Sequence, residues 1–380
     1  MKIWIALTDD WELRGNGTGR VSQLQCKPAA RLMDLYERLG IRSTFNVEVM
    51  QQLAFERYAQ GDAEFRAERD AWKDSVAMMI ARGFDVQLHL HPQWLGAERV
   101  DGWWRLGTRW NLADYSISEL RQMIKAAIDY LRPIIAPHTL VSFRAGSWGI
   151  GPPSRALFEV LLENGISLDT SVVNGSYYDG EGIKLDYTNL DSPNLAYRPE
   201  LDDGRRIARG TGGDGIIEIP TQSVRRSELF GRVLRDIVGG SPIAGLAAAA
   251  QLASNSQLGL KAKSAIRSAL RKKTTSAPSF VMQDPFGFLS GKAKTDMIFD
   301  LSSSLPTLTF IRMADICIQR ARRVSGREIV VLIIENHTKD LQRDSDFARI
   351  EAIISHIQCR YPDATFHKMS EVQRVASLLV

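Results

Sequence analysis

Apolar residues recur along the chain with two spacings, one typical of strands and one typical of helices. Short apolar runs that end in turn residues predict buried strands. The pattern predicts seven strands, at residues 2–8, 42–47, 85–91, 139–144, 166–172, 215–219 and 328–334. Segments with apolar residues three or four positions apart predict helices at residues 29–40, 49–82, 116–132, 153–164, 307–322 and 344–360. Alternating strands and helices favour a parallel sheet covered by helices, and seven strands favour a barrel.

The composition is typical of a soluble globular protein. The chain has 380 residues, of which 44% are hydrophobic and 24% charged, enough for one large α/β domain with insertions or for two domains. We expect no membrane span, because no run of eighteen uncharged apolar residues occurs. The first acidic residue is Asp9, too early for a signal peptide. Three widely separated cysteines argue against a disulfide framework and favour a reducing cytoplasm.

Positive charge is concentrated between residues 224 and 274, where ten basic residues stand beside two acidic ones. The net charge of the whole chain is +4, so the remainder is mildly acidic. We expect a basic helical insertion at residues 223–283. It could lie peripherally on the anionic inner face of a membrane, or form a soluble cap with a solvated basic face. A nucleic-acid partner is not expected, because aromatic residues are not interleaved with the basic ones.

Two histidines end the third predicted strand, in the run Gln-Leu-His-Leu-His-Pro at residues 87–92. Side chains alternate between the faces of a strand, so His89 and His91 share one face. Pro92 then ends the strand, because it has no amide hydrogen. The pair could hold a metal ion, or could simply be polar residues on a partly solvated strand.

Other strands also end in residues that can perform chemistry, namely Asp9, Asp10, Arg144, Asp169 and His337. Active sites of parallel α/β folds lie at the carboxyl ends of strands. Two imidazoles and one carboxylate are a common ligand set for zinc or another divalent ion. A second carboxylate can accept a proton from water, and a separate histidine can protonate the leaving group. Asp9 and Asp10 both reach one site only if the strand ends or bulges there.

In this order, the strand-end motifs resemble those of the polysaccharide deacetylase family, also called the NodB-homology or carbohydrate esterase 4 family. The motifs are Thr-Asp-Asp at 8–10, His-x-His at 89–91, Phe-Arg-Ala-Gly at 143–146, Asp-Thr-Ser at 169–171 and His337. The resemblance implies one domain over residues 1–380, an α/β distorted (β/α)7-type barrel with helical and loop insertions. It also implies a metal-dependent hydrolase that removes an N-acyl group from an amino sugar of a polysaccharide, glycolipid or sugar precursor.

The resemblance assigns a role to each of these residues. The metal ligands that it implies, for zinc as the expected ion, are Asp10, His89 and His91. The catalytic residues that it implies are Asp9 as general base, Arg144 to orient it, His337 as general acid and Asp169 to support His337. Two features depart from the family pattern. The histidines are two residues apart rather than four, and the third motif lacks the Pro-Tyr that supplies a backbone oxyanion donor.

Tryptophans follow two of the motifs. Trp94 comes directly after the histidine pair, within a run that also holds Trp103, Trp104 and Trp110, and Trp148 follows the third motif. Aromatic faces stack on sugar rings, so we expect Trp94 and Trp148 to bind the carbohydrate substrate. The alternative is that the tryptophans after the histidine pair pack a loop onto the barrel.

Two other functions are compatible with the same residues. A glycoside hydrolase on a related barrel needs two carboxylates beside the glycosidic bond, and Asp9 and Asp169 could serve. A catalytically inactive sugar-binding protein could keep the barrel without the reaction. The deacetylase hypothesis is favoured because it gives the histidine pair and Arg144 a purpose.

Overall fold

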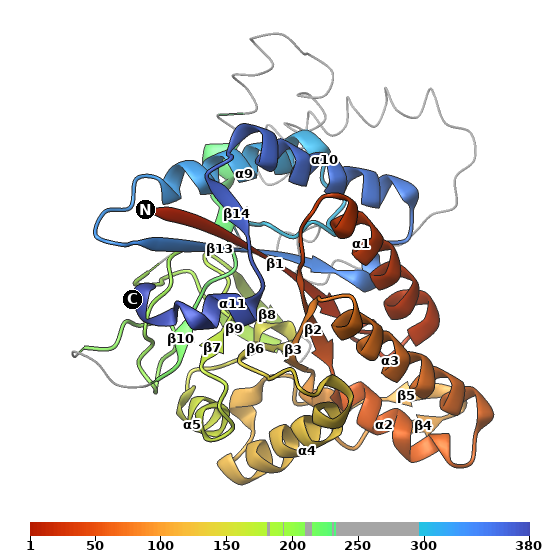
Figure 1. Cartoon of the computed structure of the whole chain (residues 1–380). Coiled ribbons are helices and arrows are strands. Elements are labelled where there is room, and N and C mark those ends of the chain that lie inside the picture. Colours follow the sequence, from red (N-terminus) through yellow and green to blue (C-terminus); the bar gives the residue numbers. More distant parts are fainter. Residues whose placement is uncertain (181–182, 193, 210–214, 230–231, 233–295) are drawn as a thin grey trace, which may run out of the picture.

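Strand β1 (Lys2–Trp11) belongs to an eight-stranded parallel sheet, in which it pairs with β2 on one side and β13 on the other (Figure 1). The other strands are β2 (Thr44–Glu48), β3 (Asp85–Leu90), β6 (Ser142–Ala145), β7 (Leu168–Asp169), β10 (Ile217–Glu218), β13 (Ile329–His337) and β14 (Ala364–Phe366). Their order is β10-β7-β6-β3-β2-β1-β13, and β14 pairs with the first half of β1. The computed structural model describes all residues except 181–182, 193, 210–214, 230–231 and 233–295.

The two edges of this sheet meet. Thr221, three residues beyond β10, forms a parallel bridge with Ile333 of β13. The next amide, that of Gln222, donates to the Ile333 carbonyl at 3.0 Å. Closure therefore depends on a bridge instead of a full strand ladder. The sheet is the distorted (β/α)7-type barrel expected from the sequence, so the predicted fold class is confirmed.

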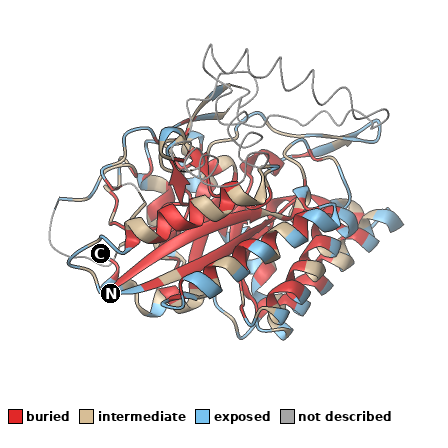
Figure 2. Cartoon of the chain, turned by 90° about the horizontal axis from the view of Figure 1, so that it is seen from above, coloured by how far each residue is buried: buried red, intermediate tan, exposed pale blue. Residues whose placement is uncertain are grey.

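Side chains alternate between the inside and the outside of the barrel. On β1, β7, β10 and β13 the inner side chains toward the amino-terminal end are apolar and include Ala6, Leu168, Ile217 and Ile333. Helix α11 (Met369–Arg374) packs Met369 and Val372 against this layer and so closes the amino-terminal end. The outer side chains form the larger core with the surrounding helices. Figure 2 shows buried strands inside helices that expose only their outer sides.

The helices around the barrel begin and end close to the predicted positions. They are α1 (Lys27–Arg38), α2 (Met50–Ala59), α3 (Ala63–Ala81), α4 (Ile117–Ile135), α5 (Arg155–Glu163), α9 (Thr307–Ala321) and α10 (Asp344–Arg360). Helices α2 and α3 together fill the segment predicted as helical over residues 49–82, with a break around Gly61 between them. Ser116 caps α4 together with Glu119, whose carboxylate accepts a hydrogen bond from the Ser116 amide.

Several short elements depart from the prediction. The predicted loops contain two hairpins, β4 (Glu98–Val100) with β5 (Trp103–Arg105) and β8 (Tyr177–Gly180) with β9 (Ile183–Asp186). Strand β14 follows the last predicted helix. Strand β1 continues to Trp11 instead of ending at Thr8. This longer β1 decides which acids reach the site.

The predicted basic insertion begins where β11 (Ser223–Val224) pairs antiparallel with β12 (Met297–Ile298). Most of residues 223–283 lies outside the described part of the chain, so the expected basic helices and their membrane contact remain predictions. Among the helices that the structure does describe, none combines the length and the apolar composition that a membrane span requires.

Candidate active site

The residues that could perform chemistry lie on the inner face of the barrel, at the carboxyl ends of the strands. Strand β1 keeps a regular register with β2, with Asp9 opposite Phe45 and Asp10 opposite Asn46. Because β1 stays extended to Trp11, the alternation continues through Thr8, Asp10 and Glu12. These three side chains point inward, and Asp9 points outward.

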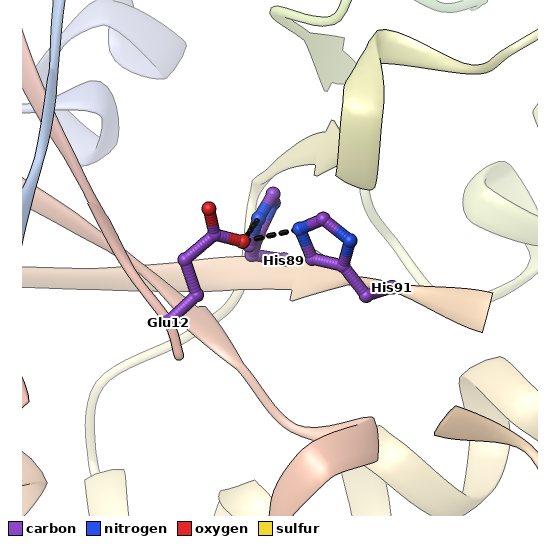
Figure 3. A group of neighbouring side chains, drawn as sticks. All are labelled: Glu12, His89 and His91. Atoms are coloured by element: carbon purple, nitrogen blue, oxygen red, sulfur yellow. Dashed lines mark hydrogen bonds and ion pairs between the residues drawn. The ribbon is translucent and has the colours of Figure 1, made fainter. Parts of the chain in front are cut away.

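Glu12, His89 and His91 converge on one point, as Figure 3 shows. The Glu12 Oε2 atom lies 3.0 Å from His89 Nε2 and is also in contact with His91 Nε2. All three side chains are buried, with at most 8% of their surface exposed. The predicted pairing of the two histidines on one face of β3 is therefore observed, with Glu12 as the acid beside them.

The far sides of both imidazoles are held by neighbours. His89 Nδ1 lies 2.9 Å from the Arg144 carbonyl, to which it donates when its Nδ1 is protonated. His91 Nδ1 lies 3.0 Å from the Gln93 amide, whose Oε1 has no hydrogen-bond partner among the described residues. A half-turn of that amide would let Oε1 accept from His91 Nδ1–H. Both Nε2 atoms would then be left as lone-pair donors toward Glu12.

This donor set fits a divalent metal ion. Two imidazole nitrogens and one carboxylate oxygen are a zinc ligand set that leaves a position open. Hydrogen bonds to the far nitrogens of ligating histidines are the usual way in which such rings are oriented. Burial raises the pKa of Glu12, but the charges of His91 and Lys339 outweigh it and hold that pKa well below its usual range. The carboxylate is therefore ionised, as a metal ligand must be.

Asp10 lies beside this cluster and is held by other partners. Its Oδ1 accepts hydrogen bonds from Arg144 Nη1 at 2.9 Å and from Asn46 Nδ2 at 2.8 Å. Burial alone would raise the pKa of Asp10, but the Arg144 guanidinium, His89 and His337 together lower it. Arg144 also donates to Thr8 Oγ1 at 2.8 Å. Asp10 is thus an ionised acid with a fixed orientation, and it lies outside the group formed by Glu12 and the two histidines.

His337, at the end of β13, faces Asp10 from the other side. Its Nε2 lies 3.7 Å from Asp10 Oδ2, and its Nδ1 lies 3.3 Å from Asp300 Oδ2. Burial would lower the pKa of His337, but the Asp300 carboxylate outweighs it and raises that pKa to about 10. His337 is therefore an imidazolium at neutral pH, with Asp300 as its counter-ion.

Glu335 lies deeper on the same strand face and belongs to the same network. Its Oε2 accepts a hydrogen bond from Trp148 Nε1 at 3.3 Å and lies 3.5 Å from Arg144 Nη1. The side chain is fully buried, which raises its pKa to about 8. Asp300, Glu335 and His337 are close enough to one another to hold a second ion. The ion pair between His337 and Asp300 already accounts for two of the three.

Asp9 is not part of this site. Its Oδ1 accepts hydrogen bonds from Tyr36 Oη at 3.0 Å and from Asn336 Nδ2 at 2.8 Å, between β1, α1 and β13. Burial raises the pKa of Asp9 to about 6. The expectation that Asp9 and Asp10 share one site is corrected by this geometry, because the end or bulge of β1 that it required does not occur at Asp9.

Asp169 also lies on the outer face. Its neighbour Leu168 packs inside the barrel, and Thr170 Oγ1 accepts from the inward-facing Arg144 at 3.2 Å, so Asp169 points away. Asp169 accepts from Ser171 Oγ at 2.5 Å. Burial, followed by the charge of Asp169, holds the pKa of the adjacent Glu218 well above its usual range. The expected support of His337 by Asp169 is therefore corrected, and Asp300 takes that place.

The two predicted sugar-binding tryptophans are in different places. Trp148 is next to the site, with its ring edge-to-face against His337 at a centroid distance of 6.3 Å. Trp94 is buried and packs edge-to-face on Phe55 and Trp104, at 6.2 and 5.2 Å. This packing of Trp94 favours the alternative in which it packs a loop onto the barrel, and its contact with substrate stays a prediction.

The last residue of the motif at 143–146, Gly146, packs closely against the ring of His91. A Cβ atom added to Gly146 would lie 2.5 Å from the His91 ring. Only glycine therefore lets the chain pass behind this imidazole. The next residues, Ser147 and Trp148, both have φ of 54°, which is an uncommon conformation for side chains of their size.

The residues of the site that were not predicted include Glu12, Lys339 and Asp300. Glu12 follows the predicted end of the first strand, although the spacing of Thr8, Asp10 and Glu12 is the signal that could have found it. Lys339, two residues after His337, contacts Glu12. The residues around Asp300 in the sequence do not indicate a role in the site. Asp300 lies beside His337 only because a bridge aligns it with Glu335.

Comparisons with known proteins identify the fold. Neither models of protein families nor curated proteins match the sequence. Among solved structures, a protein from Parabacteroides distasonis described as a glycoside hydrolase/deacetylase aligns with a TM-score of 0.54 at 13% identity, over 99% of this chain and 71% of its own. A protein from Mycobacterium smegmatis described as a polysaccharide deacetylase aligns with a TM-score of 0.52 at 12% identity, over 99% of this chain and 91% of its own. The chain has the polysaccharide deacetylase fold. The resemblance expected from the motifs is thus supported at the level of the barrel.

Proposed function

We propose that this protein is a metal-dependent hydrolase that removes an N-acyl group, such as acetyl, from an amino sugar. The observation that carries the proposal is the convergence of Glu12, His89 and His91 beside Asp10 and His337 on one barrel face. A metal ligand set, an ionised acid and a charged histidine can together hydrolyse an amide, as Lewis acid, general base and general acid. The deacetylase fold of the neighbours supports the same reaction class.

Glu12, His89 and His91 would hold the metal, with zinc as the ion that this donor set favours. When bound, a divalent ion polarises the amide carbonyl and makes water more acidic. Glu12 here replaces Asp10 in the ligand set implied by the family motifs. Asp10 is thereby available for a different role.

Asp10 is proposed as the general base in place of Asp9. Its carboxylate is ionised and is oriented by Arg144 and Asn46 through Oδ1, so Oδ2 can accept the proton of the attacking water. Arg144 thus orients the basic acid, as the motif resemblance implies for this arginine, although the acid is the second aspartate of the motif.

His337 is proposed as the general acid. Asp300 keeps it protonated, and its Nε2 faces the same point as Asp10 Oδ2. As water adds to the carbonyl carbon and the C–N bond breaks, the water proton passes to Asp10. His337 gives its Nε2 proton to the departing amine nitrogen. The products are a free carboxylic acid and an amino sugar.

A carbohydrate substrate is consistent with the position of Trp148, whose ring lies beside His337. The glycoside hydrolase alternative depended on Asp9 and Asp169. Both acids lie on the outer face of the barrel, where neither can flank a glycosidic bond bound inside it. The positions of these two acids therefore do not support that alternative.

The proposal is tested by metal analysis and by acyl release. The full chain should bind zinc stoichiometrically and release acetate from N-acetylated oligosaccharides, and chelation should abolish release. A protein that takes up no zinc or cobalt contradicts the proposal. A protein that binds both metal and oligosaccharide but releases no acid would support the inactive sugar-binding alternative instead.

A further inference from the structure

Lys339 brings a positive charge into the candidate metal site, and the proposed mechanism gives it no role. Its ammonium contacts Glu12 Oε1, and its side chain is only 19% exposed. The short 3₁₀ turn η5 (Thr338–Asp340) carries it there directly from the end of β13. Thr338 Oγ1 donates to the Asp10 carbonyl at 3.3 Å, which fixes this turn to β1. The position of Lys339 is therefore built by the same two strands that position His337 and Glu12.

The two oxygens of Glu12 have different partners. Oε2 faces both imidazoles, and Oε1 faces Lys339. The carboxylate consequently presents one oxygen to the histidine pair, while the ammonium occupies the other. A lysine ammonium is a compact point charge, so it acts on this carboxylate as a small cation would.

A metal ion bound by Glu12 and an ammonium on the same carboxylate repel each other across a buried, poorly screened space. Without a metal, the ammonium stabilises the site, because it is a counter-charge for the carboxylate. Glu12 has 3% of its side chain exposed, and a buried carboxylate without a counter-charge is strongly destabilising. The lysine therefore favours the metal-free site and disfavours the metal-bound one.

We propose that Lys339 is a built-in counter-cation that competes with the metal for Glu12. It compensates the charge of the carboxylate and holds it in place while no metal is bound, and it lowers the affinity of the site for the metal. The inference rests on the proposed function, in which Glu12, His89 and His91 hold the ion. It makes Lys339 a positioning residue that keeps the site assembled and the metal exchangeable.

The test compares zinc dissociation constants of full-length variants, measured by competition with a chromophoric chelator. Lys339→Met removes the competing charge and should bind zinc about tenfold more tightly or better. The metal-free form of the same variant should unfold at a lower temperature than metal-free wild type. Lys339→Arg keeps the charge and should bind zinc as wild type does.

Lys368→Met is the matched control, because Lys368 donates to the Gly83 carbonyl far from the carboxyl ends of the strands and should leave zinc affinity unchanged. If Lys339→Met does not fold, Lys339→Gln removes the same charge. Unchanged or weaker zinc binding in the uncharged variants overturns the role of Lys339. If wild type binds zinc and Glu12→Gln abolishes binding, that result leaves the proposed metal site standing. Failure of wild type to bind zinc overturns both.

Discussion

Two adjacent aspartates, one on each face of the barrel, have pKa values shifted in opposite directions. Asp10 faces inward to a guanidinium and an imidazolium, which lower its pKa. Asp9 faces outward to a tyrosine and an asparagine, and burial raises its pKa to about 6. Asp169 and Glu218, on the neighbouring strands β7 and β10, also have pKa values raised chiefly by burial. The face on which each side chain lies therefore separates Asp10 from Asp9. Facing inward alone does not lower a pKa, because burial raises that of the inward-facing Glu335 to about 8.

The sharpest test of this comparison exchanges each aspartate of the pair for asparagine. Asp10→Asn should lower acyl release by about 10²–10⁴-fold, because a general base contributes about that much. Asp9→Asn should keep most of the activity, because Asp9 contacts Tyr36 and Asn336 and no residue of the site. Steady-state kinetics on metal-loaded protein measure both. Equal loss in the two variants would remove the distinction between the faces.

A second test separates the metal ligand from the base, which are two residues apart on the same face. Glu12→Gln should weaken zinc binding by more than about 100-fold, since losing a ligand exceeds the 10–100-fold cost of losing a ligand's hydrogen-bond partner. Asp10→Asn should retain zinc. Zinc content after dialysis reports the difference. Retention of zinc by Glu12→Gln together with its loss from Asp10→Asn would restore the ligand set implied by the motifs.

Asp300 can be tested through the pH dependence of the reaction. His337 must be protonated to act as an acid, and Asp300 raises its pKa to about 10. Asp300→Asn should therefore move the alkaline limb of the rate profile to lower pH and cost about 10–100-fold in rate at neutral pH. The His337–Asp300 pair also stabilises the fold fully below pH 6.5, and this contribution is lost as pH rises through about 10. An unchanged alkaline limb would show that Asp300 does not set the protonation of His337.

The smallest effect is expected on the outer face, in stability rather than in rate. The pKa of Asp9 is about 6 in the folded protein, above its ordinary value of 3.8, so its ionisation opposes folding as pH rises between these values. Asp9→Asn keeps an oxygen for Tyr36 and Asn336 and removes that charge. It should stabilise the protein by on the order of 2 kcal/mol at pH 7.5 and by much less at pH 4. Thermal unfolding of wild type and variant at the two pH values measures the stabilisation. The same stabilisation at pH 7.5 and at pH 4 would contradict the burial of an ionised Asp9.

The sequence predicted the architecture well, because apolar periodicity reports directly which side of a strand or helix is buried. It also placed both histidines correctly, since two residues with one residue between them must share a strand face. It placed both Asp9 and Asp10 in the site, because the point at which β1 stops being extended cannot be read from the sequence. Asp300 was out of reach for another reason. Its contact with His337 is made by a bridge between segments whose pairing has no local signature.

Gly146 has a consequence for proteins that differ from this one in sequence. Any larger residue there would overlap the His91 ring, so positions 91 and 146 are linked as a pair. Glycine is needed wherever the second histidine of His-x-His is kept in this place, and the requirement lapses where that histidine is lost. The second histidine of His-x-His and the glycine of Arg-x-Gly should thus appear or disappear together. A chain carrying His-x-His with a bulky residue in place of Gly146 would have to hold its metal in another way.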